Sequence, residues 1–259
     1  AILPRMSSPA TIQERESPAV PQEKVGPRHA LTVRVTHWLT VIAFVALLVT
    51  GCEIIVSHPR FYWGETGTDQ MRPLFTIPIP ASRDMVPTGY HTVMPDENGW
   101  SRYLHFEAAW LLVFTALLYG LYGLFTGHFF RNILPERGSR NWRSFRQVIA
   151  KYRHRAPPDP GEAHSYNVVQ RAAYLVVIFV VFPLIIWTGL AMSPSFTGAF
   201  PSSVILLGGR QSARTLHFFL TGLLVLFLVV HVTMIALAGF WSRMRAMITG
   251  RAVTQKERS

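Results

Sequence analysis

Two histidines that could bind metal lie fourteen residues apart in the last apolar stretch of the chain, His217 and His231. Fourteen steps of about 100° place the second ring within about 40° of the first, on one face of a helix. The rings would then be about 21 Å apart along the helix axis. Because titratable side chains are costly inside a membrane helix, their presence here indicates a function. Two imidazoles at this spacing suit two metal centres stacked across a bilayer.

Two more histidines lie in other apolar stretches, His37 near the start of the first and His105 near the start of the second. If the first stretch runs outward across a membrane, the second and fourth run inward. His105 then shares the outer depth of His217, and His37 shares the inner depth of His231. Nothing in the fourteen-residue spacing requires this agreement, so we interpret the four as two depth-matched pairs. The remaining histidines fall in loops or at the edges of the stretches and are expected to be solvated: His29, His58, His91, His128, His154 and His164.

Paired histidines without a nearby cysteine are typical of b-type haem, whose iron is bound by two histidine imidazoles. Cys52 is the only cysteine, which excludes an intrachain disulfide, a Cys-x-x-Cys-His attachment site and iron–sulfur ligation within the chain. Pairs about 21 Å apart cannot form one four-ligand zinc shell. The alternative is that each histidine hydrogen-bonds a neighbouring helix. We favour haem because four histidines form two matched pairs.

Three of these histidines have an arginine three residues earlier, one helical turn away on the same face: Arg34, Arg102 and Arg214. Haem propionates are anionic, so these guanidinium groups are candidate propionate partners. An arginine at a helix end also extends to the membrane interface unaided, which is the alternative explanation.

The elements that must position these residues are four apolar stretches at 33–56, 104–125, 168–192 and 216–240. Each is long enough to cross about 30 Å of hydrocarbon as a helix. The whole chain is 49% hydrophobic and only 15% charged, where a soluble domain carries about a quarter charged residues. We therefore predict an all-α membrane protein built as a bundle of four transmembrane helices.

The net charge of +11 is concentrated in two segments, which makes it a topology signal. Residues 127–165 hold eight Lys and Arg against three acids, and the C-terminal tail is also basic, whereas residues 57–102 hold four basic and five acidic residues. The positive-inside rule places both termini and the 127–165 loop in the cytoplasm and the 57–102 loop outside. Anionic lipid headgroups are the expected counterions, and no nucleic acid is expected.

The organisation is one membrane domain at 29–250 between two cytoplasmic tails, 1–28 and 251–259. The first tail is rich in Pro, Ser, Glu and Gln, which predicts disorder and no signal peptide. The outer loop is rich in aromatic and prolyl residues, beginning with Phe61-Tyr62-Trp63. These side chains are either an interfacial aromatic belt or a docking face for an extracytoplasmic partner.

Several segments resemble the bacterial di-haem cytochrome b subunits of nickel–iron hydrogenases, formate dehydrogenases and thiosulfate reductases. They are Arg34-Val35-Thr36-His37-Trp38, Tyr103-Leu104-His105-Phe106, the segment 166–171 and the His-x13-His pattern. The resemblance covers about residues 28–250. The segment 58–64 is most similar to relatives associated with periplasmic molybdopterin oxidoreductases.

The resemblance implies an electron-transfer subunit of the bacterial inner membrane rather than a self-sufficient enzyme. It would carry two haem b, with His37 and His231 on the inner haem and His105 and His217 on the outer one. It would connect a periplasmic, molybdopterin-dependent catalytic subunit to ubiquinone or menaquinone. The quinone site would lie at the start of the third helix, at Tyr166, Asn167 and Gln170. The alternative for Asn167 and Gln170 is that they satisfy free N–H groups at the start of the helix. The sequence departs from some relatives at Val232, directly after His231, where they have glycine.

Two other functions stay open from the sequence alone. A haem-free transporter or proton relay would use the same histidines, but Glu53 and Glu107 are the only carboxylates in or beside the apolar stretches. A haem-handling or assembly protein would bind haem reversibly. The direction of electron flow is not encoded in any residue pattern.

Overall fold

A computed structural model describes residues 29–68, 70–78, 97–135, 138, 141–153, 168–237 and 239–250. Four helical spans in it are long and apolar enough to cross a membrane: Leu31–Ser57, Trp100–Phe125, Val168–Ala191 and Arg210–Leu237. They belong to α1 (Leu31–Ser57), α2 (Glu97–Phe125), the run from α4 to α5, and α8 (Arg210–Leu237). The predicted four-helix membrane architecture is confirmed. Both predicted tails lie outside the described residues.

The third span is the one with an internal irregularity. It consists of α4 (Val168–Val176), the π-helical turn η5 (Val177–Val181) and α5 (Phe182–Ala191). Pro183 lies in the first turn of α5, where it has no backbone N–H to continue the α-helical pattern from the preceding turn. The π turn absorbs this break, and it brings Val177 and Val181 into the buried core.

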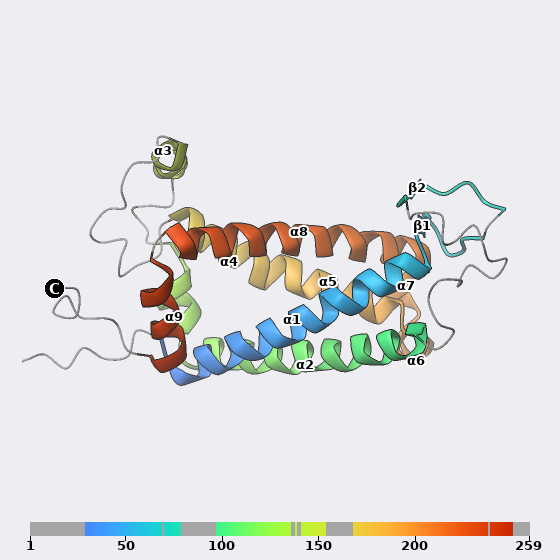
Figure 1. Cartoon of the computed structure of the whole chain (residues 1–259), viewed down its shortest axis with the longest axis horizontal. Helices are drawn as coiled ribbons and strands as arrows, with labels where there is room; N and C mark the ends of the chain where they lie inside the picture. Colours follow the sequence, from blue (N-terminus) through green and yellow to red (C-terminus); the bar gives the residue numbers. More distant parts are fainter. Residues whose placement is uncertain are drawn as a thin grey trace, which may run out of the picture.

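The helices pack as two neighbouring pairs, α1 along α2 and α5 along α8 (Figure 1). A central apolar layer lies between the levels of His217 and His231 on α8. Its buried members are Val177, Val181 and Leu224, with Phe44, Phe182, Ile185, Leu220 and Phe227 packed against them. The start of α1 and the end of α8 lie at the same end of the bundle (Figure 1). Which end faces the cytoplasm remains a prediction from charge.

A small cap, made of residues 58–68 and 70–78, lies at the other end of the bundle, beside the start of α8 (Figure 1). The strands β1 (Arg60–Phe61) and β2 (Phe75–Thr76) pair antiparallel, with Phe61 opposite Phe75. Phe61 is buried, and its ring lies 4.7 Å from the rings of both Phe75 and Phe218. The short helices α6 (Pro194–Ala199) and α7 (Ser202–Ile205) complete this end.

Backbone contacts attach the cap to α8. The Gly64 N–H donates to Ser212 Oγ at 2.8 Å, and the Gly64 carbonyl accepts from the Gln211 and Ser212 N–H groups. Gly209 makes this close approach possible, because it has φ +112° and a Cβ there would lie 2.4 Å from the Gly64 carbonyl. Thr215 adds a hydrogen bond from its hydroxyl to the Tyr62 carbonyl at 2.7 Å.

The opposite end carries three short helices, η2 (Phe129–Ile133), α3 (Trp142–Arg153) and α9 (Phe240–Thr249). Helix α9 turns across this end after Gly239, whose φ of +96° allows the sharp change of direction. The indole N–H of Trp38 donates to the Met247 carbonyl at 3.4 Å, which joins α9 to α1.

Candidate functional site

The structure brings the four intramembrane histidines together as two pairs. His105 of α2 faces His217 of α8, with ring centroids 6.4 Å apart and ring planes at 59°. His37 of α1 faces His231 of α8, also with ring centroids 6.4 Å apart and with planes at 55°. Helix α8 therefore contributes one histidine to each pair, and the pairing is the one that depth predicted.

The ring separation fits one metal ion between the two rings of each pair. A bond from a transition metal to an imidazole nitrogen is about 2.0–2.1 Å long. Two such bonds in line, plus about 1.1 Å from each nitrogen to its ring centre, separate the centroids by about 6.2–6.4 Å. Both observed separations, 6.4 Å, lie at the upper end of this range. The two histidines of each pair would thus suit the iron of a b-type haem, which they could hold between their imidazoles.

The His105–His217 pair, which the charge pattern predicts to be the outer one and which is called the outer pair below, is held by two threonines that sequence reasoning missed. Thr50 Oγ1 of α1 lies 2.8 Å from Nδ1 of His105, and Thr188 Oγ1 of α5 lies 3.0 Å from Nδ1 of His217. Each outer histidine does therefore hydrogen-bond a neighbouring helix, but through Nδ1, which leaves Nε2 for a metal. Thr-Gly pairs occur at several other places in the chain, so the dipeptide alone could not have singled out these two.

Aromatic rings surround the His37–His231 pair, which is called the inner pair on the same prediction. Trp38 lies edge-on to His37 at 5.5 Å, and Phe227 stacks on His231 at 5.7 Å. Tyr174 of α4 approaches His231 edge-on at 6.2 Å. Sequence reasoning missed Tyr174 as well, although it follows Gln170 by one helical turn on the same face.

Of the residues predicted to contact quinone, Tyr166 and Asn167 lie outside the described residues. Gln170 is the third residue of α4 and is half-buried. It lies one helical turn before Tyr174, whose ring is next to His231, and so it belongs to the same end of the bundle as His231.

The three predicted propionate partners differ in their surroundings. Arg34 is half-buried, and its Nε atom is buried without a hydrogen-bond partner among the described residues. Such a charged donor calls for an anion, which fits a propionate. Arg102 is exposed. Arg214 donates to the carbonyls of His58 and Arg60 and lies 4.7 Å from the centre of the Phe61 ring. Arg214 thus ties the cap to α8, and its propionate role stays a prediction.

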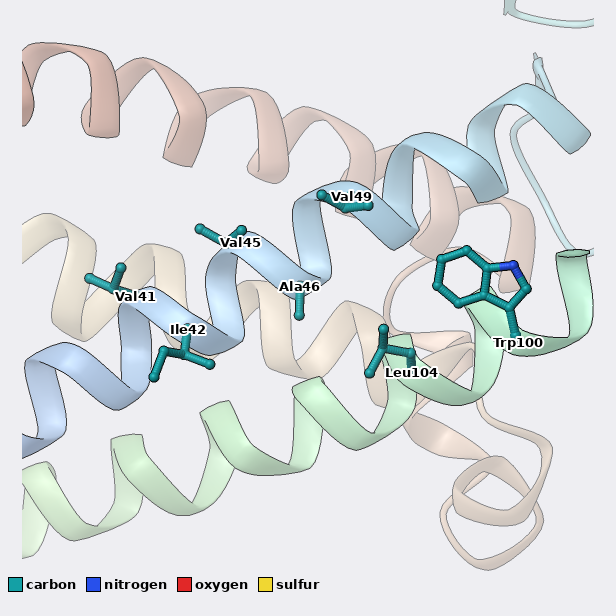
Figure 2. Close-up of a pocket in the computed structure, with 7 residues that line it drawn as sticks. All are labelled: Val41, Ile42, Val45, Ala46, Val49, Trp100 and Leu104. Atoms are coloured by element: carbon teal, nitrogen blue, oxygen red, sulfur yellow. The ribbon is translucent and has the colours of Figure 1, made fainter.

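Figure 2 shows a separate hollow between α1 and the start of α2. Its lining is Val41, Ile42, Val45, Ala46, Val49, Trp100 and Leu104. Ile42, Val45 and Val49 are exposed on the surface of α1, which in a bilayer meets lipid. The lining has no acid, base or histidine, so this hollow is distinct from the histidine pairs and suits hydrocarbon.

A comparison with known families adds the decisive observation. The model of the prokaryotic cytochrome b561 family matches residues 28–250. The chain belongs to this family. The match covers all four spans and all four paired histidines. This cytochrome b561 family member is therefore a multi-pass membrane protein that carries b-type haem and transfers electrons, and the resemblance seen in the sequence is confirmed at the level of the family.

One curated relative is similar along most of its length. A putative protein-methionine-sulfoxide reductase subunit YedZ1 of Azospira oryzae is 30% identical over 219 residues, which are 81% of this chain and 90% of that protein. No solved structure matches the chain.

Proposed function

We propose that this cytochrome is the di-haem electron-transfer subunit of an oxidoreductase complex in the bacterial inner membrane. The observation that carries the proposal is the presence of two histidine pairs with the same 6.4 Å ring separation. They share α8 and are separated along it by about 21 Å. One haem b at each pair would give two electron-transfer centres at different depths in the membrane.

His105 and His217 would hold the outer haem, and His37 and His231 the inner one. When bound, haem supplies one-electron chemistry through its ferric and ferrous states. The chain orients the imidazoles and excludes water from the space between the two levels. The central layer around Val181 and Leu224 provides this exclusion, because both side chains are buried and apolar. At the inner pair, the buried Nε of Arg34 supports a contact with a propionate.

Quinone, either ubiquinone or menaquinone, exchanges electrons at the inner pair. Gln170 and Tyr174 lie one turn apart on α4, and the Tyr174 ring is 6.2 Å from His231. The amide of Gln170 and the phenol of Tyr174 can hydrogen-bond a quinone carbonyl. Tyr166 and Asn167, which directly precede α4, belong to the same proposed site on the strength of the family resemblance.

A periplasmic, molybdopterin-dependent oxidoreductase docks on the outer end. Large apolar side chains are exposed there, including Trp63 of the cap and Ile205 and Leu206 at α7. Exposed aromatic and aliphatic groups of this kind favour a protein interface. The relative's name describes a reductase subunit, which supports an assembly with a catalytic partner. Whether electrons run toward quinone or away from it depends on the redox potentials of the partners.

Single histidine substitutions test the assignment. His217→Ala should remove the outer haem and leave the inner one, whereas His37→Ala should remove the inner haem alone, because each change deletes one of the two imidazoles that would hold that haem. Reduced-minus-oxidised spectra of the purified protein, scaled to haem content, measure both losses. His128→Ala is the matched control, since His128 lies beyond the end of α2 and bonds Asn132 instead of another histidine. Loss of both components from either single variant, or of neither, would contradict the pairing.

A further inference from the structure

The outer histidine pair has two buried hydroxyl groups beside it that come from the other helices of the bundle. Thr50 is on α1 and faces His105 of α2, whereas Thr188 is on α5 and faces His217 of α8. Both threonines are almost completely buried, at 0% and 1% exposed. Each hydrogen bond therefore joins two helices inside the bundle, away from competing water.

The direction of these hydrogen bonds follows from the single proton of each hydroxyl. Thr50 Oγ1 directs its proton at the Ala46 carbonyl, at 2.7 Å, in the preceding turn of α1. Thr188 Oγ1 does the same toward the Leu184 and Ile185 carbonyls, both at 3.0 Å. With its proton engaged, each oxygen can only accept from the histidine.

This assigns the tautomer of both outer rings. Nδ1 of His105 and of His217 carries the ring hydrogen, so Nε2 carries the lone pair that binds iron. An accepting group at Nδ1–H fixes the orientation of a metal-binding imidazole and raises its basicity. The two threonines thus act on the metal-binding nitrogen through the opposite side of the ring.

The inner pair has no equivalent among the described residues, where neither His37 nor His231 is bonded to a hydroxyl. Thr36 of α1 is buried as well, and it donates to the Thr32 carbonyl at 2.8 Å in the same way. Among the described residues, its hydroxyl makes no hydrogen bond to a histidine ring. The neighbours of the inner rings are Trp38, Tyr174 and Phe227. The two pairs therefore differ in their surroundings: threonine hydroxyls hydrogen-bond the outer histidines, whereas aromatic rings surround the inner ones.

We propose that Thr50 and Thr188 are positioning residues that set the redox potential and the retention of the outer haem separately from the inner one. The inference rests on the proposed function, because it assumes haem at both pairs. A more basic imidazole donates more electron density and so favours ferric over ferrous iron. Removing either hydroxyl should raise the midpoint potential of the outer haem and weaken its retention, while the inner haem keeps its properties.

The experiment compares Thr50→Val and Thr188→Val, which keep the side-chain shape and remove the hydroxyl, with the Ser variants, which keep the hydroxyl. Thr36→Val is the matched control. Redox titration of the full chain in detergent follows the component that disappears in His217→Ala, which marks the outer haem. At a fixed ambient potential near its midpoint, each Val variant should lower the ferric-to-ferrous ratio about two- to tenfold. Ser at either position should restore it, and Thr36→Val should leave it unchanged.

The outcomes separate this inference from the proposed function. Fewer than two haems in the unsubstituted chain would overturn the function itself. Two haems with an unchanged outer potential in both Val variants would overturn only the role of the threonines. Equal shifts at both haems, or no rescue by Ser, would show a general loosening of the bundle and would also contradict it. Haem transfer to apomyoglobin gives a second readout, with faster loss expected only from the outer site.

Discussion

Two adjacent residues of α5 lie beside the His217 ring. Its Nδ1 faces Thr188 at 3.0 Å, and Gly189, the next residue of α5, leaves room beside the same ring. The outer pair repeats this arrangement across the bundle, where Gly51 follows Thr50 and lies beside His105. On both α1 and α5, a threonine that hydrogen-bonds a histidine ring is followed by a glycine beside the same ring.

Gly189→Ala should weaken the binding of the outer haem without unfolding the protein. The new Cβ would lie 3.4 Å from Cε1 of His217, the carbon bonded to the metal-binding nitrogen, so a methyl group there narrows the space beside the iron site. We expect retention of the outer haem to fall on the order of tenfold. Gly222→Ala is the control, because nothing lies within 4 Å of a Cβ at that position on α8. Haem content and thermal unfolding of both variants measure the effect, and equal outer haem retention in the two would contradict this explanation.

Helix α8 contributes one histidine to each of the two pairs. It brings His217 and His231 to two levels, and its first turn receives the cap through Gly64 and Ser212. The cap is therefore fixed to the helix that carries His217 and His231, only a few residues before His217. A partner docked on the cap would stand next to the outer level.

The junction between the cap and α8 can be tested at Gly209. Gly209→Ala would place a Cβ 2.4 Å from the Gly64 carbonyl at a φ of +112°, so the cap must shift. Backbone strain of this kind costs about 1–3 kcal/mol, and we expect a lower midpoint of thermal unfolding. Gly198→Ala in α6 is the control, since a Cβ there meets nothing within 4 Å. If the two variants unfold at the same temperature, the cap is not held through Gly209.

For the molecule as a whole, the sequence was sufficient to predict the four spans and the pairing of the histidines. The length of each apolar stretch determines where the chain crosses a bilayer. Because successive helices cross in opposite directions, His37 and His105, each near the start of its helix, lie at opposite depths. The other contacts around the histidines and the cap could not be predicted, because they depend on how each helix is rotated about its axis and on how the loop folds. Thr50 is one example. Arg214 is another, because its contacts with His58 and Arg60 appear only when the outer loop folds back on α8.

The irregular third span was also not predictable from hydropathy, which does not register a π turn. Val177–Val181 reads as an ordinary apolar run, yet the turn there brings Val177 and Val181 into the central layer between the two levels. Pro183 was visible in the sequence as a residue that interrupts a helix, but it does not by itself specify how the break is absorbed.

The most direct test of the central proposal is the number of haems bound to each chain. Haem b should be quantified as the pyridine haemochrome in protein purified from membranes, against protein mass from amino-acid analysis. Two histidine pairs, each with ring centroids 6.4 Å apart, predict two haem b per chain and two components in a redox titration. A protein that binds one haem, or none, when haem supply is not limiting would contradict the proposal that each chain holds two haems.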